Sequence, residues 1–332
     1  MILNNDTNNK NNIYKYWPIF SFVILFLIFP FIINAYWVDT LFFFGIYALL
    51  GLSLNVVLGE VGLFDLGHMG FMAIGAYTTA ILNTTFGIPI IILLPVSAIA
   101  AGAFAWVVCS PIIHLRGDYL CIVTIGMGEI VRLVLINNPF GITGGPNGVF
   151  GIDFLSFGGL LVIDSSIEYY FVIWIIVGLT ILGLVNLQHS RIGRAWNYIR
   201  EDEIAAESSG IDVRYYKLLA FVLGAGLAGV AGNIYASKLM IVSPESFNFM
   251  ESCMLFCIVL IGGMGSIPGV LIGAAAISLF PEFFRTFAQY RMLIFGAVMV
   301  AMMIFRPGGI WPRGRGAVKF KSLLTKAGKG NV

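Results

Sequence analysis

Charged residues are scarce in this chain. Only 11% of its 332 residues are Asp, Glu, Lys or Arg, whereas 59% are hydrophobic, and the mean hydropathy is +0.92. Soluble domains carry roughly 25% charged residues. The composition therefore excludes an ordinary soluble domain and predicts an integral membrane protein. The net charge of +2 gives no reason to expect a nucleic-acid partner, and membrane lipid is the expected surrounding.

Catalytic motifs are missing as well. The histidines are His68, His114 and His189, and no H-E-x-x-H or G-x-S-x-G pattern occurs. The chain also lacks the P-loop pattern G-x-x-x-x-G-K-[ST], whose backbone cradles nucleotide phosphates. We therefore expect no catalytic residue, no metal site and no cofactor bound by this chain. If the protein depends on ATP hydrolysis, that reaction must take place on another chain.

Cysteine is rare, and its placement favours packing over chemistry. The four cysteines, all inside apolar runs, are Cys109, Cys121, Cys253 and Cys257. The last two are four residues apart and would share a helix face, as two metal ligands could. Only Glu251 lies nearby to complete such a site, so small packing residues are the preferred interpretation.

Long apolar runs predict an all-α polytopic membrane protein. A polar segment at 1–16 precedes a transmembrane domain at 17–305, and a basic tail follows at 306–332. Most runs are close to the roughly 20 residues that a helix needs to cross a bilayer. The expected crossings are Trp17–Ile33, Leu41–Leu58, a span after Gly59, then Ile88–Ile113, Tyr119–Ile136, Tyr169–Leu187, Leu218–Ser237 and Met292–Phe305. Ser252–Pro281 is either two short spans or a re-entrant hairpin, so the total is ten or eight.

Charge placement predicts the orientation of these spans. Residues 137–168 hold three acids and no Lys or Arg, whereas residues 306–332 hold seven basic residues and no acid. The loop at 188–217 holds five basic residues. Because Lys- and Arg-rich loops stay in the cytoplasm, we expect both termini and the loop 188–217 inside, and the loop 137–168 outside.

Two glycine-rich stretches interrupt the apolar pattern. Their notable residues are Gly59, Gly62, Asp65, His68, Gly262, Gly263 and Gly265. Such glycine density permits either close helix packing or a broken helix. Broken helices aim N–H dipoles at an anionic group and free carbonyls at an ammonium, so these residues are candidates for a substrate pathway. The two stretches share a G-x-x-G spacing, which leaves an internal repeat open.

Ionisable residues inside apolar runs are functional candidates by default. Asp65 and His68 could bind substrate or relay protons, and capping at the membrane interface is an equal alternative. Glu129 and Arg132 are three apart on a helix, and we predict that they pair with each other.

The hydrophilic stretch His189–Lys217 stands between two apolar runs. Within it, Arg200–Gly210 is predicted to be a short helix, with acids at its start, small residues in its middle and Gly210 as its stop. A rigid helix with a small-residue face on the cytoplasmic side predicts a docking partner. The alternative is a merely amphipathic surface helix.

Several motifs in order resemble one known family. They are GLSLNVVLGEVGLFDLGHMGFMAIGAY, RGDYLCIVTIGMGEIVRLVL, ITGGPNG, SRIGRAWNYIREDEIAAESSGIDVRYYKLLAF, VLIGGMGSIPGVLIGA and the ending FRPGGI. This series covers about residues 40–312 and is similar to the LivM-type permeases of branched-chain amino acid ABC importers. The resemblance implies the ABC importer permease fold.

The resemblance also implies partners and sites. A LivH-like second permease, two cytoplasmic ATPase subunits that bind ATP and Mg²⁺, and a periplasmic binding protein would complete a complex in the bacterial inner membrane. The expected ATPase-coupling residues are Arg200, Glu203, Ala205, Ala206 and Gly210. The family's Glu-Ala-Ala pattern is interrupted here by Ile204. The expected docking turn for the binding protein, otherwise a plain Gly/Pro turn, is Thr143, Gly144, Gly145, Pro146, Asn147 and Gly148.

The implied substrates are leucine, isoleucine and valine. Related permeases carry urea or short-chain amides, and that alternative stays open. A different class, an ion- or proton-coupled secondary transporter that uses Asp65, His68 and Glu129, would transport without an ATPase.

Overall fold

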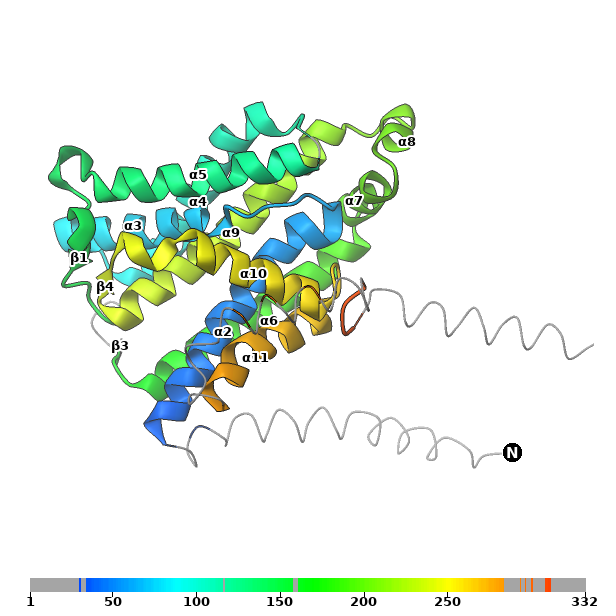
Figure 1. Cartoon of the computed structure of the whole chain (residues 1–332). Coiled ribbons are helices and arrows are strands. Elements are labelled where there is room, and N and C mark those ends of the chain that lie inside the picture. Colours follow the sequence, from blue (N-terminus) through cyan, green and yellow to red (C-terminus); the bar gives the residue numbers. More distant parts are fainter. Residues whose placement is uncertain are drawn as a thin grey trace, which may run out of the picture.

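The computed structural model describes residues 30, 34–115, 117–157, 161–283, 293, 296, 300 and 308–311. The predicted spans Trp17–Ile33 and Met292–Phe305 lie outside this part of the chain except for single residues, as does most of the tail. Within it, helices dominate (Figure 1), which confirms the all-α membrane fold.

The described α-helices match most of the predicted spans. They are α2 (Ala35–Asn55), α3 (His68–Phe86), α4 (Ile90–Ile112), α5 (Asp118–Ile136), α6 (Ser166–His189), α7 (Arg191–Glu201), α8 (Glu203–Ser208), α9 (Val213–Leu239), α10 (Phe249–Gly262) and α11 (Ile267–Phe283). By length and apolar composition, five of the described helices could cross a membrane: α2 with its extension to Val61, α4, α5, α6 and α9.

Helices α3, α4 and α9 pack against one another through small residues. A Cβ added at Gly75 of α3 would lie 2.4 Å from the Cα of Gly229 on α9, and one added at Gly229 would lie 2.5 Å from the carbonyl oxygen of Ser97 on α4. Such contacts let helix backbones approach closely where lipid supplies no hydrophobic driving force. Part of the glycine content therefore serves close packing.

Helices α10 and α11 form an antiparallel hairpin. A Cβ at Gly262 would lie 2.3 Å from the carbonyl oxygen of Gly269, and one at Gly273 would lie 2.1 Å from that of Ile258. The 14 residues of α10 rise about 21 Å at 1.5 Å per residue. The hydrocarbon core is roughly 30 Å thick, so α10 alone falls short of a crossing, which favours the re-entrant alternative.

Two small antiparallel ribbons and short helices complete the described part. Strand β1 (Val149–Phe150) pairs with β4 (Ile241–Val242), with Val149 opposite Val242, and β2 (Leu155–Phe157) pairs with β3 (Leu161–Ile163). The remaining elements are a π-helix, η1 (Val56–Val61), and three 3₁₀ turns, η2 (Pro139–Gly141), η3 (Gly145–Asn147) and η4 (Pro244–Phe247).

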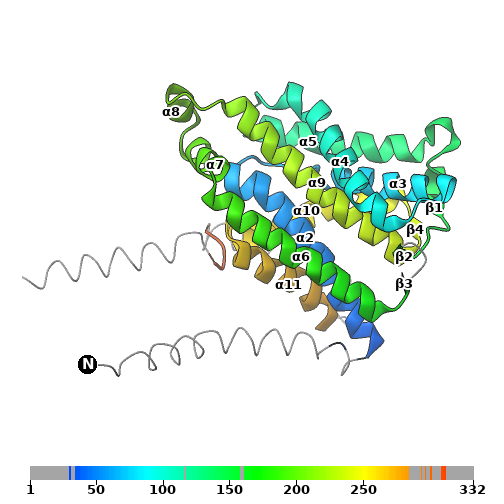
Figure 2. The same ribbon diagram turned by 180° about the vertical axis from the view of Figure 1, so that it is seen from behind.

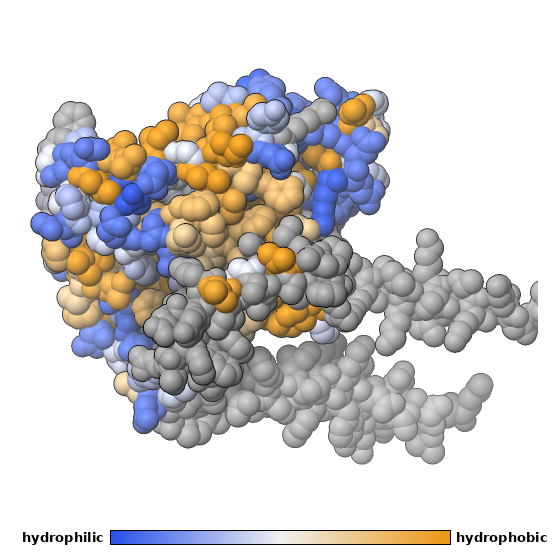
Figure 3. All heavy atoms as spheres, in the orientation of Figure 1, coloured by the Kyte–Doolittle hydropathy of each residue, from blue (hydrophilic) through white to orange (hydrophobic). Residues whose placement is uncertain are grey.

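The two ends of the bundle differ in character. Helices α7 and α8 lie at one end and strands β1, β3 and β4 at the opposite end, and Figure 2 shows the same arrangement from behind. Apolar side chains cover the middle of the face drawn in Figure 3, and hydrophilic ones gather toward both ends. This pattern fits a bundle whose middle lies in lipid.

Candidate functional site

The two glycine-rich breaks meet in space. The chain leaves the π-helix η1 at Gly62, whose φ is +83°, and the second break contains Gly265 with φ +79°. The side-chain oxygen of Asn55 accepts the backbone N–H of Gly265 at 2.9 Å. A Cβ at Gly59 would lie 2.5 Å from the same nitrogen, so this approach requires glycine. Single-turn π segments inside helices are frequent at functional sites.

The C-terminal residues that the structure describes close the second break. The N–H groups of Ile310 and Trp311 donate to the carbonyl oxygens of Ile261 and Gly262 at 2.8 and 3.0 Å. Gly263 has φ +121°, and a Cβ there would lie 2.6 Å from the carbonyl oxygen of Trp311. Three of the predicted pathway glycines, Gly59, Gly262 and Gly263, are thus packed against backbone in this conformation, whereas the neighbour of Gly62 is the Arg200 side chain.

Asp65 and His68 form a buried polar cluster with Ser53 of α2. His68 Nδ1 lies 2.8 Å from Asp65 Oδ2, and His68 Nε2 lies 2.6 Å from Ser53 Oγ. The other oxygen of Asp65 accepts the N–H of Gly67 at 2.9 Å. All three side chains are 0% exposed. The structure therefore brings the two sequence-predicted residues together inside the bundle.

This cluster has the order of contacts of a Ser-His-Asp triad. A nucleophile also needs a substrate atom within reach and donors for an oxyanion, and the Ser53 hydroxyl is enclosed by the bundle. The cluster instead ties α2 to the start of α3, since buried polar groups that satisfy one another rigidify a fold. Among the described residues, no group of three His, Cys, Asp or Glu side chains is placed to hold a metal.

The hydrophilic loop folds as two helices, which corrects the prediction of one helix over Arg200–Gly210. Helix α7 ends at Glu201, and Asp202 adopts an extended conformation and caps α8 by accepting the N–H groups of Ile204 and Ala205. An aspartate side chain competes well for these donors at a helix start, so the chain turns there.

Gly210 ends α8, as predicted. Its φ is +83°, its N–H donates to the carbonyl of Glu207, and the N–H of Ile211 donates to that of Ala206. These two bonds make a Schellman motif. The motif brings the chain directly into α9.

The predicted coupling residues divide into two groups. Ala205 and Gly210 are exposed, as is Ile204. Ala206 is buried against the protein, Glu203 pairs with Lys217 of α9 at 2.7 Å, and Arg200 donates from Nη1 to the carbonyl oxygen of Gly59 at 2.5 Å. The first group can face a partner, and the second holds α7 and α8 onto the bundle.

The predicted docking turn is tightly wound. Thr143 Oγ1 donates to the carbonyl oxygen of Leu135 at 2.8 Å. Positive φ angles at Gly144, Gly145 and Gly148 shape the turn. Its exposed members are Gly144, Pro146 and Asn147. The turn lies next to η4 and β4, at the end of the bundle opposite α8.

Glu129 and Arg132 pair as predicted. Arg132 Nη2 lies 2.6 Å from Glu129 Oε1, and Arg132 Nη1 lies 2.9 Å from Glu245 of η4. The guanidinium thus bridges α5 and η4. This arrangement is that of a structural ion pair with partly exposed carboxylates.

The comparison with known proteins decides the family. A family model described as branched-chain amino acid transport system / permease component matches residues 36–305. The chain belongs to this family. It is 41% identical over 328 residues to the high-affinity branched-chain amino acid transport system permease protein LivM of Escherichia coli K12, an alignment that covers 92% of this chain and 77% of that one.

A second relative is similar at lower identity. The permease protein LivH of the same transport system in E. coli K12 is 27% identical over 289 residues, which covers 80% of this chain and 91% of LivH. No solved structure matches the chain. The permease is therefore related to both types, and more closely to the LivM type.

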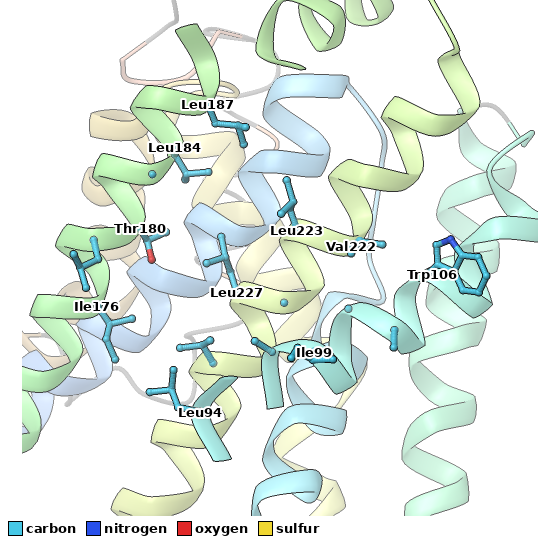
Figure 4. A pocket seen from close by; sticks show the side chains of 17 residues that line it. Leu94, Ile99, Trp106, Ile176, Thr180, Leu184, Leu187, Val222, Leu223 and Leu227 are labelled. Carbon is cyan, nitrogen blue, oxygen red and sulfur yellow. The ribbon is translucent and has the colours of Figure 1, made fainter. Parts of the chain in front are cut away.

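A large apolar pocket of the permease lies between α4, α6 and α9. Its volume is about 950 Å³, and its lining is aliphatic apart from Trp106 and Thr180 (Figure 4). An amino acid zwitterion placed there would leave both charges unpaired, at a high desolvation cost. The pocket suits hydrocarbon rather than a charged solute.

Sequence reasoning missed several residues that organise the site. Asn55 lies in an apolar run and bonds to Gly265, which is 210 positions away. Lys217 is 3% exposed and pairs with Glu203. Glu60 accepts the amide of Gln188 at 2.6 Å. For Asn55 the available signal was a polar residue inside an apolar run, but for none of these residues could the partner be read from the sequence.

Proposed function

We propose that this permease is the membrane-spanning subunit of an ATP-driven importer for leucine, isoleucine and valine. The permease carries out no chemical step. ATP with Mg²⁺ is hydrolysed on two separate cytoplasmic ATPase subunits. A second, LivH-like permease completes the pathway, and a periplasmic binding protein delivers the substrate. Membership of the permease family and the 41% identity to LivM support this proposal.

The observation that carries the proposal is the exposed tip formed by α8. Ile204 is 63% exposed and Ala205 is also exposed. An apolar side chain beside a small one on a short, firmly capped helix suits insertion into a groove of a partner. The Asp202 cap and the Gly210 stop hold the tip in one shape.

Two contacts of charged side chains are among those that connect α7 and α8 to the membrane domain. The buried Lys217 ties Glu203 of α8 to α9, and Arg200 ties α7 to the π-helix at Gly59. Movement of the docked tip would therefore reach the point where the two glycine breaks touch. Interrupted helices are where transport proteins often build their substrate sites.

The orientation follows from charge. The tip belongs to the loop 188–217, whose Arg191, Arg194 and Arg214 are exposed. Lys- and Arg-rich loops stay on the cytoplasmic side of the inner membrane. The opposite end then faces the periplasm, where the exposed Pro146 and Asn147 are placed to meet the binding protein. Both termini lie in the cytosol in this arrangement.

The test is a pair of substitutions at one exposed position. In the complex assembled with its ATPases, second permease and binding protein, Ala205→Trp should abolish leucine uptake and ATPase co-purification, because the bulk blocks a close approach. Ala205→Ser should retain both. Membrane insertion should be equal in the two variants. Normal uptake by Ala205→Trp would defeat the coupling proposal.

The same assay separates the competing functions. Uptake that urea or acetamide competes for, and leucine does not, would favour the amide-permease alternative. Uptake by the permease alone that an ionophore collapses and ATP does not affect would favour ion coupling through the buried Asp65 and His68.

A further inference from the structure

A second cavity differs from the apolar pocket because one of its walls is ionisable. It has a volume of about 250 Å³ and lies between α2, α3, α9, η4 and α10. Small-molecule sites usually range from roughly 300 to 1,000 Å³, so this cavity suits a ligand smaller than a drug. Its lining residues are Phe43, Ile46, Tyr47, Leu50, Met69, Met72, Tyr235, Ser246 and Glu251.

The polar residues that line the cavity come from α2, α9, η4 and α10. The hydroxyl of Tyr47 donates to Glu251 Oε2 at 3.0 Å. Tyr235 and Ser246 supply two further hydroxyls to the lining, and Ser246 Oγ lies 3.4 Å from Ser243 Oγ. Glu251 takes part in none of the ion pairs between the residues that the structure describes. Glu251 lies in the first turn of α10, and its partner Tyr47 lies near the middle of α2. An ionisable group inside a membrane domain is a functional candidate by default.

The remaining lining is apolar and branched or flexible. Ile46 and Leu50 come from α2, and Met69 and Met72 come from α3; all four are buried. Methionine adapts its shape to different aliphatic partners. One cavity is therefore lined both by a carboxylate with hydroxyls and by aliphatic side chains.

The cavity also adjoins the elements that move in the proposed mechanism. The N–H of Met69 donates to Ser252 Oγ at 3.3 Å, which joins the start of α3 to α10 next to Glu251. Leu50 lies five residues before Asn55, which contacts Gly265. A shift at the glycine breaks would therefore alter the walls of this cavity.

We propose that this cavity is a substrate subsite for an aliphatic α-amino acid, in which Glu251 receives the ammonium group and Tyr47 positions that carboxylate. The hydroxyls of Tyr235 and Ser246 face the polar end of the substrate, and Leu50, Met69 and Met72 enclose its side chain. The inference rests on the proposed import function and names the site within this subunit where it occurs.

The first test measures turnover in the full importer complex in proteoliposomes. Glu251→Gln keeps the shape and removes the charge, and leucine import should fall about tenfold or more, as expected for loss of a hydrogen bond to a charged group. In Glu251→Gln, the KM for the loaded binding protein and the rate of ATP hydrolysis should not change. Tyr47→Phe should lower import less. The matched control is Glu245→Gln, an exposed carboxylate outside the cavity, which should import normally.

The second test stays informative if Glu251→Gln fails to assemble. In a background with the native cysteines replaced by alanine, Ser246→Cys should react with a small methanethiosulfonate reagent. Leucine supplied with binding protein and ATP should slow this reaction. Import by Glu251→Gln within twofold of the unmodified complex, or labelling of Ser246→Cys at the same rate with and without leucine, would overturn the subsite. Absence of leucine import by the unmodified complex would instead contradict the import function itself.

Discussion

The Arg200 guanidinium on α7 donates a hydrogen bond to the carbonyl oxygen of Gly59 at 2.5 Å. Gly59 lies within the π-helix, and its neighbour across the interface is the backbone nitrogen of Gly265. A helix of the loop 188–217 thus contacts the point where two broken helices meet. This relationship explains how a tip outside the membrane domain can act on helices inside it.

Replacing Arg200 should uncouple transport from ATP hydrolysis. Arg200→Gln removes the charged donor to Gly59, and leucine import should fall about tenfold, the scale of typical coupling free energies. ATP hydrolysis by the assembled complex should continue. The measurement is the ratio of ATP hydrolysed to leucine imported.

The control for this ratio lies on the same helix. Arg194→Gln removes an exposed guanidinium that donates to the carbonyl of His189 and does not touch the glycine breaks. Its ratio should equal that of the unmodified complex. An equal rise of this ratio in Arg200→Gln and Arg194→Gln would show a general effect of removing a positive charge.

Gly59 should not tolerate a methyl group. A Cβ there would lie 2.1 Å from the Asn55 side-chain oxygen and 2.5 Å from the Gly265 nitrogen, so Gly59→Ala should destabilise the permease by about 1–3 kcal/mol. Gly126→Ala, where nothing lies within 4 Å, should be neutral or slightly stabilising. The apparent melting temperature in detergent measures both. A tolerated Gly59→Ala would mean that the breaks do not pack as described.

The ion pair between Glu203 and Lys217 should stabilise the packing of α8 against α9. The effects of replacing the two residues should therefore not be additive. Because Lys217 is 3% exposed, Glu203→Gln leaves its ammonium without a counter-charge and should lower the stability. Lys217→Met added to Glu203→Gln should recover part of the loss. The double-mutant cycle should give an interaction of about 0.5–3 kcal/mol, and strict additivity would contradict the contact.

The buried cluster at His68 should behave as a structural lock. His68→Leu leaves the Asp65 carboxylate, which is 0% exposed, without its histidine partner. The free energy of unfolding should fall by about 3 kcal/mol or more. The double variant with Asp65→Leu should be more stable than His68→Leu alone.

Import by the unmodified complex should be insensitive to a protonophore while ATP is supplied. Collapse of import under these conditions would instead assign the cluster a role in proton transfer.

Long apolar runs made most helices of the permease predictable. The span predicted at Tyr119–Ile136 is α5, and the pair of Glu129 with Arg132 followed from helical spacing. Composition and periodicity report on local structure, and these features are local.

Contacts between distant segments were not predictable in the same way. The Asn55 bond to Gly265 and the Arg200 bond to Gly59 span 210 and 141 positions, and neither has a local signature. The turn between α7 and α8 was missed for a different reason. Asp202 was counted among the acids of a helix start, whereas its side chain caps α8 and so ends α7.

The most direct test of the account is a cross-link from position 205. Ala205→Cys, in a background with the native cysteines replaced by alanine, is joined to its nearest neighbour by a short thiol-reactive cross-linker in the assembled complex. Coupling through α8 predicts a cross-link to the ATPase subunit, with a yield that changes when ATP binds, and no labelling of Ala205→Cys by an impermeant reagent added from the periplasmic side. Labelling from the periplasmic side, or a complex in which position 205 forms no cross-link to the ATPase, would contradict it.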